Sequence, residues 1–233
     1  MMQRFEKQEF YNRYDPDTIL SFHDLEFFKC KFLGGGFGYR YTDDFSRRTS
    51  AKNIRVIDCE SQKFGIGPAL LEDIYVENFR GDLVTVWGAL FKHVTIKGRC
   101  DKLMIHGAAK PGMLHGDLAR YWDICNVFYT DVDWALDIRE AEFNDFCIRT
   151  GGVPANLVRR DPETQVMIKR NKAIEGKWRE LGLSGLTQMF FKDLIEEAPP
   201  AAVLVAPKRH KKDFKDVLED IRRLRDVGIA EPE

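Results

Sequence analysis

Short stretches of alternating apolar and polar residues recur every twenty residues over much of the chain. "NIRVIDC" from Asn53, "DIYVENF" from Asp73 and "HVTIKGR" from His93 align at this step, and "DLEFFKC" from Asp24 joins them if "YRYTDDFSR" is an insertion of nine residues. A fixed period is the sequence signature of stacked repeats. The pattern therefore predicts strands that stack at one pitch.

The aligned stretches share two apolar columns, separated by a polar or mixed one. The first column holds Leu25, Ile54, Ile74 and Val94, and the second holds Phe27, Val56, Val76 and Ile96. Residues two apart in a strand lie on the same side of it, so both columns face inward. The column between them faces outward and holds Glu26, Arg55, Tyr75 and Thr95.

A finer period of five residues runs through these stretches. The inward series are Phe27, Phe32 and Phe37; Val56, Ser61 and Ile66; Val76, Gly81, Val86, Phe91 and Ile96; and Ile138, Phe143 and Ile148. Five residues per side and twenty per turn describe a coil of four sides. One such coil cannot bury its inner face alone, so neighbouring coils must stack into a continuous core.

The five-residue pattern resembles that of the pentapeptide-repeat proteins. "AEFND" places Ala141 and Phe143, and "CKFLG" places Cys30 and Phe32, in the two positions that this family turns inward. The resemblance implies a right-handed four-sided parallel β-helix. Elsewhere Ile, Val and Phe stand where the family has a small residue, and Ser61, Gly81 and Asp101 interrupt the central positions.

Ordinary antiparallel strands are the alternative explanation of the spacing. Hairpins of that kind favour Asn-Gly or Asp-Gly turns, which are absent between the repeated strands. Single glycines recur instead, at Gly81, Gly88, Gly98 and Gly107, where a coil would have to turn. The coil is the favoured prediction.

The pattern changes after Gly151 and Gly152. Helical spacing is present in "KAIEGKWRELGL", "TQMFFKDLIEEA" and "KRHKKDFKDVLEDIRRLRDVG", and "AAVLVAP" has the composition of a buried strand. We expect a mainly β protein with three parts: an N-terminal arm over residues 1–19, the coil over 20–153, and a small α/β appendage over 154–233 that caps or flanks the coil.

Composition narrows the function classes. The chain has 36 Lys and Arg residues and 37 Asp and Glu residues, so its net charge is near zero. A protein whose whole surface binds nucleic acid would have an excess of basic residues. Some pentapeptide-repeat proteins resemble DNA and bind topoisomerases, a role for which this near-neutral charge is unsuited. Signal and membrane segments are not evident, so we expect a cytoplasmic protein with no membrane contact. Five cysteines without CxxC spacing indicate reduced, buried thiols. We expect no cofactor.

Two clusters could carry chemistry. Asp131, Asp133 and Asp137 crowd Arg139, and neighbouring carboxylates can divide acid and base roles as in glycoside cleavage. This supports the alternative of a β-helix enzyme acting on a carbohydrate. In another segment, His106, His115 and Asp117 have the ligand types of a metal site, although their spacing matches no known metal-binding motif.

Basic residues gather before the last predicted helix. Lys208, Arg209, Lys211 and Lys212 could contact nucleic acid, a second alternative function. Acidic residues are interleaved further along the same segment, and they would weaken its attraction for phosphate. A solvated helix face with internal charge pairs is the simpler interpretation, and nucleic acid is not the expected partner.

Large residues on the outside of the coil give the favoured functional hypothesis. Tyr75, Trp87 and Leu90 should project outward, and His93 starts its repeat at an outward corner. Exposed aromatic residues mark contact surfaces. The sequence therefore predicts a non-enzymatic binding or scaffolding protein that uses the flat sides of the coil, with another protein or a second copy as partner. The same aromatic residues could instead receive the C-terminal helices.

Overall fold

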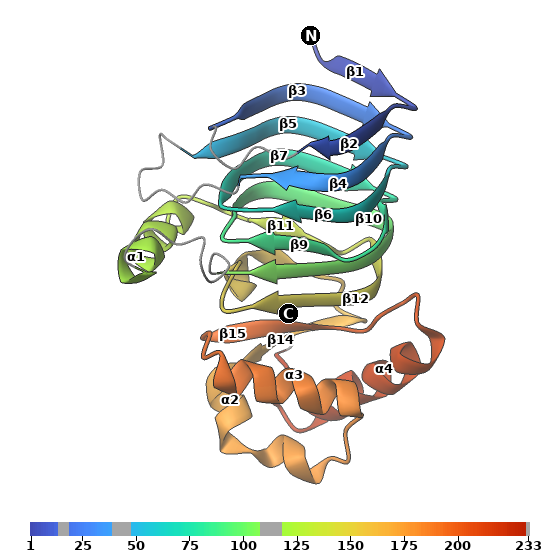
Figure 1. The fold of residues 1–233 in the computed structure, drawn as a ribbon. Helices are drawn as coiled ribbons and strands as arrows, with labels where there is room; N and C mark the ends of the chain where they lie inside the picture. Colours follow the sequence, from blue (N-terminus) through green and yellow to red (C-terminus); the bar gives the residue numbers. More distant parts are fainter. Residues whose placement is uncertain (14–18, 39–47, 108–117, 232–233) are drawn as a thin grey trace.

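A curled sheet of parallel strands forms most of the molecule (Figure 1). The computed structural model describes residues 1–13, 19–38, 48–107 and 118–231. Within them, the strands of this sheet are β1 (Gln3–Glu6), β2 (Glu9–Arg13), β3 (Ser21–Phe28), β4 (Lys31–Phe37), β5 (Thr49–Ile57), β6 (Glu60–Ile66), β7 (Ala69–Glu77), β8 (Arg80–Gly81), β9 (Val84–Trp87), β10 (Leu90–His106), β11 (Leu136–Asp137), β12 (Ala141–Arg149) and β13 (Val158–Arg159). The predicted mainly β fold is confirmed.

The sheet has two sides that share an interior. On one side, here called the A side, β1, β3, β5, β7, β11 and β13 lie in one stack; β2, β4, β6, β8, β9 and β12 form the B side. Strand β10 belongs to both, because Val94 pairs with the A side and the residues from Gly98 onward pair with the B side. The chain therefore winds from side to side as it descends through the stack (Figure 1).

The strand register reproduces the twenty-residue period. Ile54 lies beside Ile74, which lies beside Val94, and both pairings are parallel. Leu25 lies beside Ile54, as the alignment with an insertion requires. The insertion itself, residues 39–47, lies outside the described residues. The alternative of antiparallel strands is wrong for this region, because hydrogen bonding between successive coils is parallel throughout.

Left-handed backbone recurs at steps of five residues in the curled sheet, at positions that we call corners. Asn53, Asp58 and Lys63 all have φ between 51° and 53°. Such a conformation is uncommon for residues other than glycine, and Asn and Asp tolerate it best. Side chains at these corners bond from coil to coil: the Asn78 Nδ2 atom donates to the Asp58 Oδ1 atom at 3.0 Å.

Helix α1 (Leu118–Tyr129) is inserted between β10 and β11 and lies against the outside of the sheet (Figure 1). The sequence patterns did not predict it. Leu90 is packed with Cys125 and Tyr129 of this helix and is only 1% exposed. Part of the outer surface of the A side is therefore covered by an element from within the coil region.

The C-terminal appendage has its own small core. Its elements are η2 (Ala155–Leu157), β14 (Gln165–Lys169), α2 (Arg170–Glu175), η3 (Lys177–Glu180), α3 (Gly185–Glu196), β15 (Ala201–Val205) and α4 (Lys211–Asp226). β14 and β15 pair antiparallel, and α3 and α4 pack beside them around Phe191 and Ile221. The helix expected over "KAIEGKWRELGL" stops early, because Gly176 has a left-handed φ of 78° after α2.

The appendage is joined to the last coil by hydrogen bonds, an ion pair and shared apolar packing. The Gln165 side chain donates to the Ile138 carbonyl at 2.9 Å, and the Arg209 amide donates to the Phe143 carbonyl at 3.1 Å. Arg149 of β12 forms an ion pair with Asp193 of α3 at 2.9 Å. Val203 of β15 joins the core of the coil. The lower end of the stack is thus covered (Figure 1).

Strand pairing extends beyond the expected coil limits of 20–153 at both ends. β1 and β2, which lie within the segment expected to be an arm, pair with β3 and β4. β13, within the segment expected to be the appendage, pairs with β11. Alternation of apolar and polar residues is weak in these short strands, which explains why the pattern did not include them.

Candidate functional site

Tyr75 lies on the outward column of the A side, as the alternation predicts. Its hydroxyl donates to the Glu77 carboxylate at 2.7 Å, and this bond, together with burial, raises the pKa of Tyr75. The Arg55 guanidinium lies over its ring at 4.7 Å. The ring is only half-buried, so one face pairs within the molecule and part of it stays accessible.

Trp87 lies on the outer face of the B side, where it stacks on His106. The two ring centroids are 3.9 Å apart and the planes differ by 8°. Burial and the nearby Arg149 charge lower the pKa of His106. Both side chains are half-buried, so the stacked pair presents a flat, partly apolar surface to solvent.

Leu90 and His93 have other surroundings. Leu90 is covered by α1, so it contacts this helix and not the C-terminal helices that the sequence suggested. His93 is a corner residue with left-handed backbone, as Asp73 is one coil earlier. Its Nε2 atom lies 2.7 Å from Asp133 and its Nδ1 atom 3.3 Å from Asp73. These polar contacts tie successive coils together.

The carboxylate cluster is divided among separate partners. Asp133 bonds to His93, which lowers the pKa of Asp133. Asp137 is nearly buried, and although burial opposes ionisation, hydrogen bonds and charge from Arg139 at 2.6 Å leave its pKa lowered. Asp131 is exposed. A glycosidase acid needs a raised carboxyl pKa, and neither Asp133 nor Asp137 has one.

Two of the four basic candidates form ion pairs, and one of these pairs joins the appendage to the rest of the molecule. Lys208 pairs with Asp161 at 2.9 Å, and Arg209 pairs with Asp101 of β10. Lys211 and Lys212, at the start of α4, are exposed. The basic segment therefore presents fewer accessible charges than its sequence suggests.

For the metal candidates, the structure places only His106, in its stack with Trp87. His115 and Asp117 lie outside the described residues. Within the described ranges, His, Cys, Asp and Glu side chains form no group of three suited to a metal ion. Cys30, Cys59, Cys100 and Cys125 are buried thiols, and burial raises the pKa of Cys59 to about 12.

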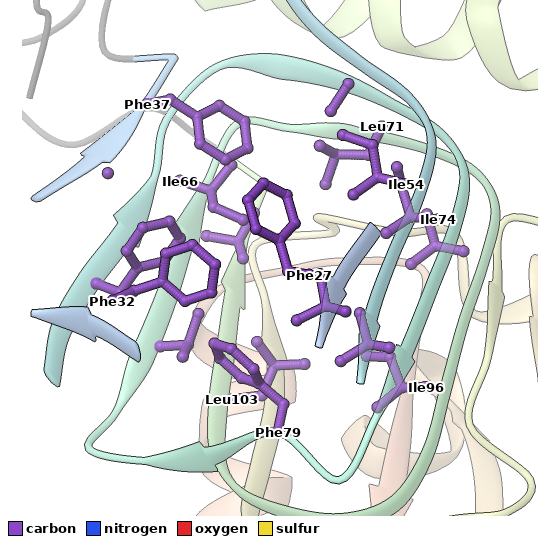
Figure 2. Close-up of a pocket in the computed structure, with 18 of the residues that line it drawn as sticks. Phe27, Phe32, Phe37, Ile54, Ile66, Leu71, Ile74, Phe79, Ile96 and Leu103 are labelled. Carbon is purple, nitrogen blue, oxygen red and sulfur yellow. The ribbon is translucent and has the colours of Figure 1, made fainter. Parts of the chain in front are cut away.

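The interior of the curled sheet holds a large apolar cavity of about 790 Å³. Phe32 and Ile66 of the B side face Ile54 and Ile74 of the A side across it, with Phe27 reaching into the middle (Figure 2). Phe27, Phe32 and Ile66 are only half-buried although they point inward. Apolar side-chain surface inside the coil is therefore accessible to molecules of the size of water.

The lining extends from Phe5 of β1 and Phe10 of β2 to Phe143 of β12, and it includes no residue of β11 or β13. Aromatic rings dominate its first coils: Phe5 stacks on Phe27 at 5.2 Å and Phe10 on Phe32 at 5.4 Å between ring centroids. In the later coils most lining side chains are aliphatic, with Phe79, Phe91 and Phe143 among them. The space is long and almost wholly apolar.

All charged residues in the lining lie at one place on the B side. They are Arg80, Asp82, Asp101 and Lys102. Here β6 pairs with β8 at Gly81 and with β9 only from Thr85 onward, and β10 pairs with β9 only from Leu103 onward. We call this interruption of the ladder, bounded by the four charged residues, the window.

Gly81 makes the close approach at the window possible. Its φ is 137°, and a Cβ atom at this position would overlap the Ser61 carbonyl oxygen. Its amide donates to the Asp101 carboxylate at 2.8 Å. Arg80, Asp82 and Lys102 are exposed while also lining the cavity, so the cavity communicates with solvent at this point.

Sequence reasoning assigned the inward residues to the core but missed the cavity between them. The available signal was the concentration of Phe at inward positions of the early coils, beside interrupted central positions at Ser61 and Gly81. Comparison with protein-family models, curated proteins and solved structures finds no match to this chain. No helix in the described ranges is long and apolar enough to cross a membrane.

Proposed function

We propose that this chain is a non-enzymatic binding protein that holds an elongated apolar molecule inside its curled sheet. The observation that carries the proposal is the cavity of about 790 Å³, whose lining is apolar except at the window. Ligand pockets in proteins are commonly of this size, mostly apolar, with few polar groups that fix orientation. Covering the accessible aromatic and aliphatic surface favours binding by about 0.8 kcal/mol for each buried methylene group.

The dimensions of the stack support an elongated ligand. Six successive coils contribute to the lining, from β1 and β2 to β12. Neighbouring strands are about 4.8 Å apart, so five steps give a length of roughly 24 Å. A molecule with an extended chain fits this shape better than a compact ring system does.

The proposal includes the specific architecture that the sequence predicts, a right-handed four-sided parallel β-helix similar to that of the pentapeptide-repeat proteins. Left-handed corners at Asn53, Asp58 and Lys63, and again at Asp73 and Asn78, support it because they recur at intervals of five residues. In such a coil, the four inward rows would surround the ligand on all sides.

Filling the cavity tests the binding proposal. We expect the wild-type chain to enhance the fluorescence of the apolar dye N-phenyl-1-naphthylamine, and the double variant Val56→Phe, Val76→Phe to bind it about tenfold more weakly or worse. Val56 and Val76 line the cavity side by side and are half-buried, so added rings would occupy ligand space. Titration of dye fluorescence gives both dissociation constants.

The matched control is Thr85→Phe, which places a ring on the outer face between the buried residues Val84 and Val86. It should bind the dye as wild type does. Wild-type protein that does not bind the dye, or a filled variant that binds it with unchanged affinity and a native circular dichroism spectrum, would refute the proposal.

A second candidate function is contact with another protein, or with a second copy, through the outer faces. The half-buried stack of Trp87 on His106 favours it, because aromatic side chains at an accessible flat surface are typical of interface centres. Tyr75 would mark a similar surface on the A side.

For this candidate, we expect Trp87→Ala to abolish any concentration-dependent dimerisation seen by sedimentation equilibrium, and to reduce recovery of a bound protein in affinity pulldown. Thr85→Ala, on the same face, serves as the control. If the wild-type chain is monomeric and Trp87→Ala and Tyr75→Ala leave every recovered partner bound, the outer faces have no such role.

A further inference from the structure

The window gives the cavity a polar opening on the B side. Of its four charged residues, two are neutralised by their neighbours: Arg80 pairs with Glu60 at 3.1 Å, and Asp101 pairs with Arg209. The other two, Asp82 and Lys102, are exposed and make no ion pair with any residue that the structure describes. One carboxylate and one ammonium group thus remain available to a ligand at the rim.

The rest of the lining cannot accept a charged group. Apart from the window, it consists of hydrophobic side chains, glycine and Gln3 at the first coil. Burying a charge among apolar side chains without a partner is strongly unfavourable. A ligand with a charged head must therefore place that head at the window and its apolar part along the interior.

The position of the window sets the direction of the tail. The window lies between the coils of β8 and β10, and the aromatic lining formed by Phe27, Phe32 and Phe64 lies in the coils above it. From β8 to β2 there are three coil steps, or roughly 14 Å at about 4.8 Å for each step. An extended dodecyl tail is about this long.

We infer that the ligand is a single-chain amphiphile with a zwitterionic head, held with its head at the window between Lys102 and Asp82 and its tail among the phenylalanines. This inference rests on the proposed function. The unpaired ammonium of Lys102 complements a phosphate, and the unpaired carboxylate of Asp82 complements a quaternary or primary amine. A purely anionic or cationic head would meet one favourable and one repulsive charge.

Three amphiphiles with the same dodecyl tail test the inference. Dodecylphosphocholine, dodecanoate and dodecyltrimethylammonium are each titrated, below their micelle-forming concentrations, into protein loaded with N-phenyl-1-naphthylamine at pH 7. We expect dodecylphosphocholine to displace the dye at a concentration about two- to fivefold lower than either of the other amphiphiles. This factor corresponds to the free energy of one exposed ion pair.

Two charge-removing variants separate the contributions of the rim. Lys102→Gln should weaken the binding of dodecylphosphocholine and dodecanoate and strengthen the binding of dodecyltrimethylammonium. Asp82→Asn should weaken the binding of dodecylphosphocholine and dodecyltrimethylammonium and strengthen the binding of dodecanoate. Each shift should be about two- to fivefold and should diminish with added salt. Lys192→Gln on α3 and Asp216→Asn on α4 remove exposed charges elsewhere and should change nothing.

The two proposals fail differently. If the dye does not bind, or binds equally well to the cavity-filled variant, the proposed function itself is wrong. If the dye binds in the cavity but the three amphiphiles displace it equally, or their order is the same in both window variants, the inference about the head is overturned while the apolar site stands.

Discussion

Gly81 shows how one residue shapes the window. The carbonyl of Ser61, from the preceding coil, occupies the space that any side chain would need, and the Gly81 backbone has a φ of 137° that other residues rarely adopt. The same residue donates its amide to Asp101, which aligns the rim of the window. A glycine that looks like a gap in the five-residue series is therefore a requirement of local packing.

We predict that Gly81→Ala lowers the free energy of unfolding by about 2–3 kcal/mol, because the methyl group overlaps backbone and the φ is strained. Urea denaturation followed by circular dichroism measures this. Gly185→Ala is the control, since no atom lies within 4 Å of the place its methyl group would take and its φ is not in the left-handed region. Equal stability of Gly81→Ala and wild type would contradict the packing argument.

The ionisation of Asp137 should make the stability of the folded protein depend on pH. Its pKa is lowered in the folded state because hydrogen bonds and charge from Arg139 outweigh its burial, so its ionised form favours folding. That contribution is complete above the unfolded pKa of about 3.9 and is lost as the pH falls through the lower folded value. Asp137→Asn should therefore be less stable than wild type near pH 7.

The stability difference between wild type and Asp137→Asn should shrink as the pH falls below about 4, which denaturant midpoints at several pH values can show. Asp145→Asn, which alters an exposed carboxylate on β12, should show little difference at either pH. A deficit for Asp137→Asn that stays constant with pH would mean that shape, and not charge, determines its effect.

At the scale of elements, the strands could be predicted from sequence and α1 could not. Strand pairs such as Ile54 with Ile74 follow from alternation, because the inward side is buried and fixes the register. "LARYWDICNVFY" of α1 has helical apolar spacing too, but its residues lie inside a region already assigned to coils. Its docking on Leu90 depends on the three-dimensional position of β10, which no local pattern contains.

We predict that Tyr129→Phe weakens the docking of α1. The Tyr129 hydroxyl accepts a hydrogen bond from the Phe91 amide at 3.2 Å, and its loss leaves that amide without this partner, at a cost of about 1–3 kcal/mol. Thermal unfolding and amide exchange at Phe91 measure the effect. Tyr11→Phe, at an exposed site on β2, is the control. Unchanged exchange at Phe91 would rule out this role.

At the scale of the whole molecule, the two ends of the stack differ. The appendage covers the last coil through Gln165, Arg209 and Arg149, whereas β1 forms the outer edge at the first coil among the described residues. Exposed strand edges promote association between chains. The charged residues Arg4 and Glu6 of β1, which flank Phe5, disfavour such pairing at the upper edge.

We predict that a chain ending at Gly152 associates into oligomers or aggregates, because removing the appendage uncovers the β12 edge and the apolar surface under Val203 and Val205. Multi-angle light scattering compares it with the full chain at equal concentration. A truncated chain that stays monodisperse at the mass of a monomer would show that the appendage is not needed as a cover.

The candidate site shows where sequence reasoning ends. Inward rows such as Phe27, Phe32 and Phe37 could be predicted because strand alternation and the period of five fix the facing of each residue. Whether those rows meet or leave space depends on the distance between the A and B sides, which the corners and their backbone angles determine. The window likewise arises from a local failure of strand pairing that side-chain patterns do not encode.

The corner between the B side and the next A-side strand has a consequence for engineering. The usual step between coils is 20 residues, yet Leu25 pairs with Ile54 and Val94 with Leu136, so longer segments enter at this corner without disturbing the register. The same corner is short between β6 and β7, and between β9 and β10. We therefore expect these short links to accept a grafted reporter or binding loop without a change in the register of the neighbouring strands.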